Sequence, residues 1–361
     1  MAPTSCIAEP PRDQDLVVEP NLTGLEIRLI PGRRLLAEQV AKWHELQDSN
    51  PDLANPCFSP EFTQAVAAVR EDVEVAILAQ RGEIQAFFPF QRRFGGRGIP
   101  VGGVVSDYHG LVCRPGFGCD TRLLLKGCGL ATWDFNRLLA SQQCFASHHK
   151  LCEPSAIIDL SEGFEAYITE RRAAGTRQID QCIYMGRRLQ REVGPLRFVA
   201  HSADKALLRR VLDWKSQQYQ RSRWPDLFAT RWGRGLAEVI HSIQRPKFSG
   251  MLSLLYAGGS LVAGHFGMRS ATVWHYWFPA YDRAFAKYSP GLVLLFNMAR
   301  QAENLDLRSI DVGTGITLYK RRLMNFSVPV AEGSIERPSC LWAMRSARRH
   351  FRALIKSCRA N

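Results

Sequence analysis

The sequence around residue 290 combines residue types that bind anions. Ser289-Pro290-Gly291 has the order typical of a helix start, with serine at the N-cap and proline in the first helical position. Backbone N–H groups in a first helical turn lack partners and lie at the positive end of the helix dipole, so phosphates bind there. Gly291 would let a ligand approach the backbone closely. The same residues also form ordinary helix starts, so a phosphate site and a purely structural turn are both open.

Regular elements are expected on both sides of this turn. Apolar residues recur at helical spacing from Leu292 onward and predict an amphipathic helix over 289–303. Upstream, residues 272–278 alternate as a strand with aromatic side chains on both faces. Downstream, residues 308–312 read as another strand. The turn is therefore predicted between a buried strand and a helix that packs on it.

The chain nearly repeats itself. Residues 73–90 and 251–268 each read as two extended runs around a glycine-containing turn, which predicts two β-hairpins. An offset of 177 residues superposes the turn glycines Gly82 and Gly259. The same offset places Trp133-Asp134 on Ile310-Asp311. This pattern indicates a duplicated unit.

The order of the elements predicts an α+β protein. Each half runs strand, helix, antiparallel strands, helix, strand, and 361 residues suit about two domains. The predicted boundaries are a flexible N-terminal extension at 1–24, a first domain at 25–162, an arginine-rich helical linker at 163–195, a second domain at 196–336 and a basic C-terminal helix at 337–361.

The positive charge is concentrated in two stretches. Residues 171–197 carry +5 and residues 337–361 carry +7 of the formal net charge of +13. The remainder is nearly neutral, so a protein that coats nucleic acid is not expected. The second stretch reads as a basic amphipathic helix, which would either lie on an anionic membrane surface or dock on the second domain. No run is long and apolar enough for a membrane span, and 1–20 lacks a signal-peptide layout, so a cytoplasmic protein is predicted.

The ten cysteines do not form a recognisable framework. None belongs to a CxxC pair, which favours scattered free thiols in a reducing compartment. Cys144, His148, His149 and Cys152 lie within nine residues, but their spacing matches no common structural zinc pattern. The sequence therefore predicts no metal site.

Several stretches of the second half resemble the CelD-like acetyltransferases of the GNAT superfamily. In chain order they are His-Tyr-Trp-Phe-Pro-Ala-Tyr-Asp-Arg from His275, Ser-Pro-Gly from Ser289, Ile-Asp-Val-Gly-Thr-Gly from Ile310 and Leu-Tyr-Lys from Leu318. The clear resemblance covers 252–325, and a weaker one covers 55–134 and 177–189. This family is associated with cellulose and other polysaccharide biosynthesis and is similar to the FemABX transferases, which carry two GNAT-like halves. The resemblance implies two tandem GNAT-like domains, each a mixed central sheet flanked by helices.

The resemblance also implies a place for an acyl-CoA co-substrate. In GNAT folds the CoA pyrophosphate lies at the start of the helix after the fourth strand, and Ser289, Pro290, Gly291 and Leu292 occupy that place here. The usual Arg/Gln-x-x-Gly-x-Gly/Ala loop is absent from the sequence. The first half has no Ser-Pro-Gly before its short helix at Asp120. Only the second half is therefore expected to bind the donor.

Acyl transfer needs a base for the acceptor proton and donors for the developing oxyanion. His265 and Asp311 are the candidate bases, although His265 also reads as a core residue and Asp311 as a ligand of turn amides. His275, among aromatic residues, reads as structural. Tyr319 would protonate the leaving thiolate, and Lys320 would neutralise phosphate or polarise the acceptor, unless Lys320 is merely solvated.

The acceptor contacts are expected from both halves. The candidates are Asp107, Tyr108, Tyr276 and Asp282, together with the linker arginines Arg187 and Arg188, which would grip an anionic acceptor or form a solvated helix face.

The function predicted from the sequence is direct transfer of an acyl group, most simply acetyl, from CoA. The acceptor would be an amine or hydroxyl of a sugar, a polysaccharide precursor or a related metabolite. No Gly-x-Ser-x-Gly or comparable nucleophile motif supports a covalent intermediate. Two alternatives remain open: a Fem-type aminoacyl transferase that uses charged tRNA, and a non-catalytic accessory subunit of a polysaccharide synthase, docked through its basic C-terminus.

Overall fold

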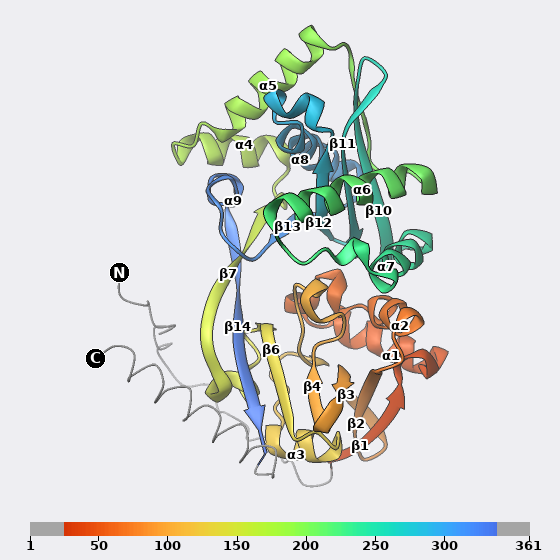
Figure 1. The fold of residues 1–361 in the computed structure, drawn as a ribbon. Coiled ribbons are helices and arrows are strands. Elements are labelled where there is room, and N and C mark those ends of the chain that lie inside the picture. The colour runs from red at the N-terminus through yellow and green to blue at the C-terminus, as the bar shows by residue number, and fades with distance from the viewer. Residues whose placement is uncertain (1–24, 338–361) are drawn as a thin grey trace, which may run out of the picture.

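The computed structural model describes residues 25–337 (Figure 1). The predicted N-terminal extension at 1–24 and almost all of the predicted C-terminal helix at 337–361 lie outside the described residues. Within 25–337, no helix is both long and apolar enough to cross a membrane.

The first half contains seven strands and three α-helices. They are β1 (Leu25–Pro31), α1 (Ala37–Asp48), α2 (Pro60–Val69), β2 (Val73–Gln80), β3 (Glu83–Arg93), β4 (Arg97–Ile99), β5 (Val112–Cys113), α3 (Thr121–Gly127), β6 (Thr132–Leu139) and β7 (His149–Asp159). Two further helices, α4 (Phe164–Ala173) and α5 (Gln178–Glu192), lead to the second half.

The second half repeats this order. Its elements are β8 (Leu196–Val199), α6 (Lys205–Ser222), α7 (Arg231–Ser242), β9 (Gln244–Arg245), β10 (Phe248–Ala257), β11 (Ser260–Arg269), β12 (Val273–Tyr281), α8 (Pro290–Gln301), β13 (Ser309–Gly313), α9 (Leu318–Leu323) and β14 (Phe326–Glu336). Short 3-10 helices at the turns include η2 (Pro51–Leu53), η3 (Pro56–Phe58), η5 (Gly103–Val105) and η8 (Arg283–Tyr288).

The local predictions are largely confirmed. Both hairpins form, as β2–β3 and β10–β11, and the helix predicted at 289–303 is α8. Strand β4 ends at Ile99, and the chain then turns. Gly102 and Gly103 have φ of 79° and 57°, a backbone conformation that ends a strand.

The two halves share one sheet of fourteen strands. Its order is β1-β2-β3-β4-β6-β14-β7-β13-β12-β11-β10-β8, with β5 and β9 at the side. Each half therefore gives its last strand to the other: β14 pairs with β6 of the first half, and β7 pairs with β13 of the second. The two exchanged strands also pair with each other, antiparallel, in the middle of the sheet. Figure 1 shows them as long strands that run between the lower and the upper half.

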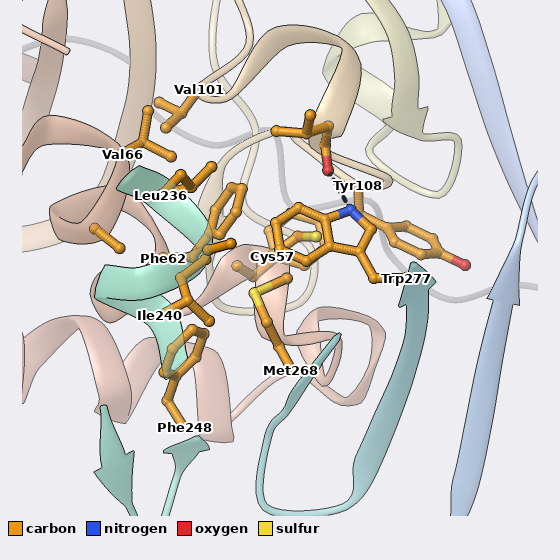
Figure 2. Packing of buried hydrophobic residues seen from close by; sticks show 14 of the residues in the cluster. Cys57, Phe62, Val66, Val101, Tyr108, Leu236, Ile240, Phe248, Met268 and Trp277 are labelled. Atoms are coloured by element: carbon orange, nitrogen blue, oxygen red, sulfur yellow. Dashed lines mark hydrogen bonds between the residues drawn. The ribbon is translucent and has the colours of Figure 1, made fainter. Parts of the chain in front are cut away.

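A hydrophobic core fixes the halves against each other. Phe62 and Val66 of α2 pack with Leu236 and Ile240 of α7, and the indole of Trp277 from β12 lies beside them (Figure 2). The Trp277 Nε1 group donates a hydrogen bond of 2.9 Å to the carbonyl of Val105 in the first half. Burial of these large side chains, at about 1.5–3 kcal/mol each, makes the junction a core and not a hinge.

The fold class is thus α+β, as predicted: a large mixed sheet flanked by helices and built from two halves of the same order. Parallel pairs lie at corresponding places in the two halves, shifted by one residue relative to the offset of 177. Trp133 pairs with Gly98 in the first half, and Ile310 pairs with Trp274 in the second.

Candidate active site

Strands β12 and β13 diverge after a short parallel pairing, and the place between their diverging ends is called the cleft below. The two strands run parallel through only three residue pairs, the last of which is His275 with Asp311. β12 continues to Tyr281 and stays paired with β11 on its other edge. Over residues 276–281, the edge that faces β13 has no partner strand among the described residues. A free strand edge offers N–H and C=O groups to an extended ligand that carries amides.

Helix α8 begins beside this cleft, but Ser289 does not cap it as expected. Ser289 occupies the N-cap position, yet its side chain makes no cap hydrogen bond. The reason is its left-handed backbone, with φ 49° and ψ 51°, because the same residue also ends η8. The Ser289 carbonyl accepts from the amides of Leu292 and Val293. Pro290 has no N–H, so within the described residues the Gly291 amide is the first-turn donor left without a partner.

Positive side chains gather next to the α8 start. Arg188 Nε donates to Glu192 Oε1 at 2.9 Å, and Lys287 Nζ lies 3.7 Å from Glu192 Oε2. The Tyr288 hydroxyl donates to the same carboxylate. Hydrogen bonds from Arg188 and then Tyr288 lower the pKa of Glu192 to about 2. Arg191 Nη2 also lies 3.5 Å from Glu192 Oε1, so three cations share one carboxylate. The Arg188 guanidinium lies over the ring of Tyr288, next to Ser289, while Arg187 is exposed on α5.

Two tyrosines line the α8 side of the sheet. The Tyr276 hydroxyl donates to the Gly291 carbonyl at 3.3 Å. Its pKa is raised well above the ordinary value by burial and then by the neighbouring Tyr319. Burial also raises the pKa of Tyr319, which packs against the second-half core from α9. Both hydroxyls are therefore protonated at neutral pH, the state that a proton donor requires.

On the opposite face, His275 and Asp107 join the two halves. Asp107 Oδ2 lies 2.9 Å from His275 Nε2, and Asp107 Oδ1 lies 3.1 Å from Arg137 Nη1. Arg137 Nε also donates to the Thr314 hydroxyl, which follows β13. Gly313 has a φ of 76°, and a Cβ there would lie 3.3 Å from Asp107 Oδ2. Asp107 therefore approaches the second-half backbone closely at the point where β13 ends.

Asp311 is a buried carboxylate at the base of the cleft. Its Oδ2 accepts from Asn55 Nδ2 and its Oδ1 accepts from the Gly313 amide, both at 2.8 Å. Burial raises its pKa, while His275 partly opposes the shift. The nearby Tyr108 hydroxyl is buried without a hydrogen-bond partner, and its pKa is raised by burial and then by Asp311. Asp311 thus binds a turn amide, as one interpretation of the sequence expected, and burial makes its carboxylate more basic than an ordinary aspartate.

Two lysines lie at the open end of the cleft. Lys320 Nζ donates to the carbonyls of Gly313 and Thr314, at 3.2 and 2.6 Å. Burial lowers its pKa, and Asp107 opposes the shift. Lys215 of α6 donates to the Pro279 carbonyl at 3.3 Å. Burial and then Lys320 lower the pKa of Lys215 to about 8.

His265 lies apart from these groups. Nothing of its ring is exposed. Nε2 accepts from the Trp277 amide at 3.1 Å, which leaves Nδ1–H to donate to the Ser253 hydroxyl at 3.4 Å. Burial lowers its pKa to about 3, and its ring stacks on Tyr276. Both ring nitrogens of His265 are hydrogen-bonded inside the sheet, so this side chain is not placed to take a proton from an acceptor.

Asp282 and the cysteine–histidine group have local roles. Asp282 follows β12 and caps η8 by accepting from the Ala284 amide at 2.9 Å. His148 lies 3.0 Å from the Thr121 hydroxyl, whereas Cys152 lies 3.9 Å from His149. In residues 25–337, no three His, Cys, Asp or Glu side chains are grouped so as to hold a metal ion.

The structure brings together residues that the sequence analysis did not single out. Asn55, Arg137 and Lys215 belong to no motif. For Lys215 a signal was available in the sequence, because it continues the apolar helical spacing of Leu208, Val211 and Leu212.

A cavity of about 420 Å³ adjoins Asp311. Its walls come from η2 of the first half and from β7, β13 and β14, where the halves exchange strands. Asn55 and Tyr108 line it together with Asp311. The cavity therefore reaches the base of the cleft from the side of the first half.

Comparisons with known proteins agree with this geometry. A family model described as an acetyltransferase (GNAT) domain matches residues 180–321, which include β12, α8, β13 and the start of α9. The chain is similar in structure to FemX, with 9% identity, a TM-score of 0.57 and coverage of 82% of this chain and 94% of FemX. It is also similar to the "C-terminal Domain (DUF2156) of Putative Lysylphosphatidylglycerol Synthetase from Agrobacterium fabrum", with 12% identity, a TM-score of 0.52 and coverage of 86% and 96%. No curated protein matches. The chain thus has a GNAT-type acyltransferase fold, and its candidate site lies in the segment that the acetyltransferase model matches.

Proposed function

We propose that this protein transfers an acyl group from acyl-CoA to an amine or hydroxyl acceptor. The observation that carries the proposal is the open edge of β12 over 276–281, beside the free amide of Gly291. CoA has the matching chemistry: its arm contains two amides, and its other end carries phosphates. The amides would pair with the strand edge, and the phosphates would lie at the α8 start, near Arg188 and Lys287.

The acyl transfer itself follows from the side chains around the cleft. The acceptor atom attacks the thioester carbonyl, the new C–N or C–O bond forms, and the C–S bond breaks. Asp311 takes the acceptor proton, because burial has made its carboxylate more basic than usual. Tyr319 gives a proton to the leaving sulfur, and exchange with water restores both groups. Strand-edge N–H groups stabilise the developing oxyanion.

The Asp107 bridge has a positioning role in this scheme. It ties the loop before Tyr108 to His275 and Arg137, and thereby holds the first half over the second-half cleft. Lys320 and Lys215 place positive charge at the open end, where an anionic donor would enter.

A calorimetric titration with acetyl-CoA tests the proposal. At Gly291 the nearest neighbour of an added Cβ is Tyr281 Cδ1 at 3.7 Å, so a side chain fits there. Gly291→Asp should fold normally, since an acidic residue suits a first helical turn, but its charge should repel the phosphates. We expect the wild type to bind acetyl-CoA, Gly291→Ala to bind with similar affinity and Gly291→Asp to lose binding. Wild-type affinity in Gly291→Asp would show that the donor site lies elsewhere.

The second candidate is a Fem-type aminoacyl transfer from charged tRNA. The structural similarity to FemX, over 82% of this chain, favours it. In that case the wild type would bind no acetyl-CoA, yet would release a labelled amino acid from aminoacyl-tRNA to an acceptor. A polysaccharide-related acceptor, as the CelD-like resemblance implies, would be found by screening labelled acetyl transfer to saccharides and to simple amines. If the protein were inactive in both assays, the accessory-subunit hypothesis would be the one that still stands.

A further inference from the structure

The cavity beside Asp311 has apolar walls and one buried polar end. Leu139, Ile157, Val273 and Val328 are among the side chains that line it. At the polar end, Asp311 is only 2% exposed, and the buried Tyr108 hydroxyl close to it has no hydrogen bond within 25–337. A buried hydroxyl that no protein group satisfies is costly, by about 1–3 kcal/mol, so a ligand that bonds to it would gain accordingly.

The charge of the cavity differs from that of the chain. Three aspartates line it, Asp52, Asp159 and Asp311, against one arginine, Arg308, and no lysine. The chain as a whole has a formal net charge of +13. In the part of the chain that the structure describes, Asp311 accepts hydrogen bonds from neutral donors, the Asn55 amide and the Gly313 N–H group, and the neutral Tyr108 hydroxyl lies nearby. The lining of this cavity therefore favours cations over anions.

We infer that the cavity binds the acceptor, and that the acceptor is a primary amine on a compact apolar body. The inference rests on the proposed function for its donor. An ammonium group has three N–H donors, which match the remaining lone pairs of Asp311 and the Tyr108 oxygen. A sugar would bring several hydroxyls against apolar walls that cannot satisfy them. A phosphate or carboxylate would be repelled by the negative charges of the aspartates.

The proton balance of the reaction fits an amine held in this way. The bound ammonium gives one proton to Asp311 and becomes a neutral amine. That nitrogen attacks the thioester carbonyl, the amide bond forms, and the C–S bond breaks. Asp311 releases its first proton to water and then takes the second proton that the nitrogen loses as the amide forms. Tyr319 gives its proton to the leaving sulfur and recovers one through water from Asp311, so one net proton is released.

Three small probes with one apolar body test the inference directly: 2-phenylethylamine, 2-phenylethanol and phenylacetate. Their dissociation constants for the full-length wild type are measured by NMR titration without any CoA ester. We expect the amine to bind at least about tenfold more tightly than the alcohol, because its hydrogen bond to Asp311 is charge-assisted. Phenylacetate should not bind. Equal affinity for amine and alcohol, or tighter binding of phenylacetate, would overturn the inference.

Two variants locate the binding. Asp311→Asn keeps the size of the side chain and should remove the preference for the amine. Val328→Trp should fill the half-buried wall of the cavity and abolish binding of all probes. Leu151→Trp, on β7 outside the cavity and 55% exposed, is the matched control and should bind like the wild type. Unchanged amine affinity in a folded Val328→Trp protein would show that the amine binds elsewhere.

The same samples are titrated with acetyl-CoA. Loss of amine selectivity with normal acetyl-CoA binding would overturn the acceptor inference and leave the proposed function. Selective amine binding without any acetyl-CoA binding would support the cavity and overturn the proposed function.

Discussion

The two halves end their parallel strand pairs in opposite ways. In the first half, β4 stops after pairing with β6, and the segment at 106–111 then lies along β6. His109 forms a parallel bridge with Leu138, and the Leu139 amide donates to the His109 carbonyl. In the second half, β12 continues past its last pair with β13, and α8 follows after one short turn. One cleft is closed by the protein's own chain, and the other is open.

Asp134 and Asp311, which occupy equivalent places in the two halves, also have different surroundings. Asp134 of the first half pairs with Arg97 and accepts a hydrogen bond from the Ser334 hydroxyl at 2.7 Å. Asp311 is buried and has only neutral donors. A duplicated position has thus become a structural ion pair in one half and a basic carboxylate in the other.

This difference indicates that the two copies of the duplicated unit have different roles. The segment that closes the first cleft also carries Asp107 and Tyr108, which reach the second cleft. In the proposed scheme, the second half therefore supplies the donor site and the first half supplies a wall of the acceptor site.

The largest effect is expected at Asp311. Asp311→Asn removes the base and should lower kcat by about 100- to 10,000-fold. Asp134→Asn, the matched change in the first half, should leave kcat unchanged. The raised pKa of Asp311 also predicts that wild-type kcat falls at acid pH, with a midpoint above the ordinary aspartate value, since only the ionised carboxylate takes a proton. Equal losses in both variants would contradict the division between the halves.

A smaller loss of activity is expected when the contact between Asp107 and His275, which joins the halves, is removed. Asp107→Asn keeps one oxygen for Arg137 but loses the carboxylate that His275 contacts. Because Asp107 positions the acceptor side, kcat/KM should fall by about 10- to 100-fold, while the acetyl-CoA dissociation constant from calorimetry stays the same. A loss of donor affinity as large as the loss of kcat/KM would place Asp107 in the donor site instead.

The open cleft is also expected to hold its buried lysine at a cost in stability. The pKa of Lys215 is about 8 in the folded chain and 10.5 in its ordinary state. Between these values the unfolded chain binds more protons, so wild-type stability should rise as pH increases from about 8 to 10.5. Lys215→Met should be more stable than the wild type at pH 7, by about 1–3 kcal/mol. Urea unfolding at pH 7 and pH 10 should show that this advantage shrinks at the higher pH; a constant difference would mean that Lys215 does not titrate there.

The smallest effect is expected at Ser289. A serine that caps a helix contributes about 1 kcal/mol, but the Ser289 side chain makes no cap bond. Ser289→Ala should therefore change the free energy of unfolding by less than about 0.5 kcal/mol. Asp204→Ala is the positive control, because Asp204 accepts from two amides at the start of α6. A loss in Ser289→Ala equal to that in Asp204→Ala would show that Ser289 caps α8 in solution.

Local sequence signals were sufficient for much of the fold. The hairpins, the start of α8 and the offset between Asp134 and Asp311 follow from patterns within a few residues. The strand exchange could not be predicted in this way, because β7 and β14 present the same alternation whichever half they join. His275 looked like a core residue because its neighbours are aromatic, and its partner Asp107 lies 168 residues away. The orientation of the Ser289 side chain depended on a left-handed backbone that the Ser-Pro-Gly order does not reveal.

Hydrogen–deuterium exchange with and without acetyl-CoA tests the central claim most directly. If the donor binds only in the second-half cleft, exchange should slow for the amides of 276–281 that face away from β11 and for Gly291. The segment at 106–111 should show no change, because its Ser106, His109 and Leu111 amides already donate hydrogen bonds within the first half. Protection of 106–111 by acetyl-CoA, or a labelled acetyl transfer that proceeds with no protection at 276–281, would contradict the claim.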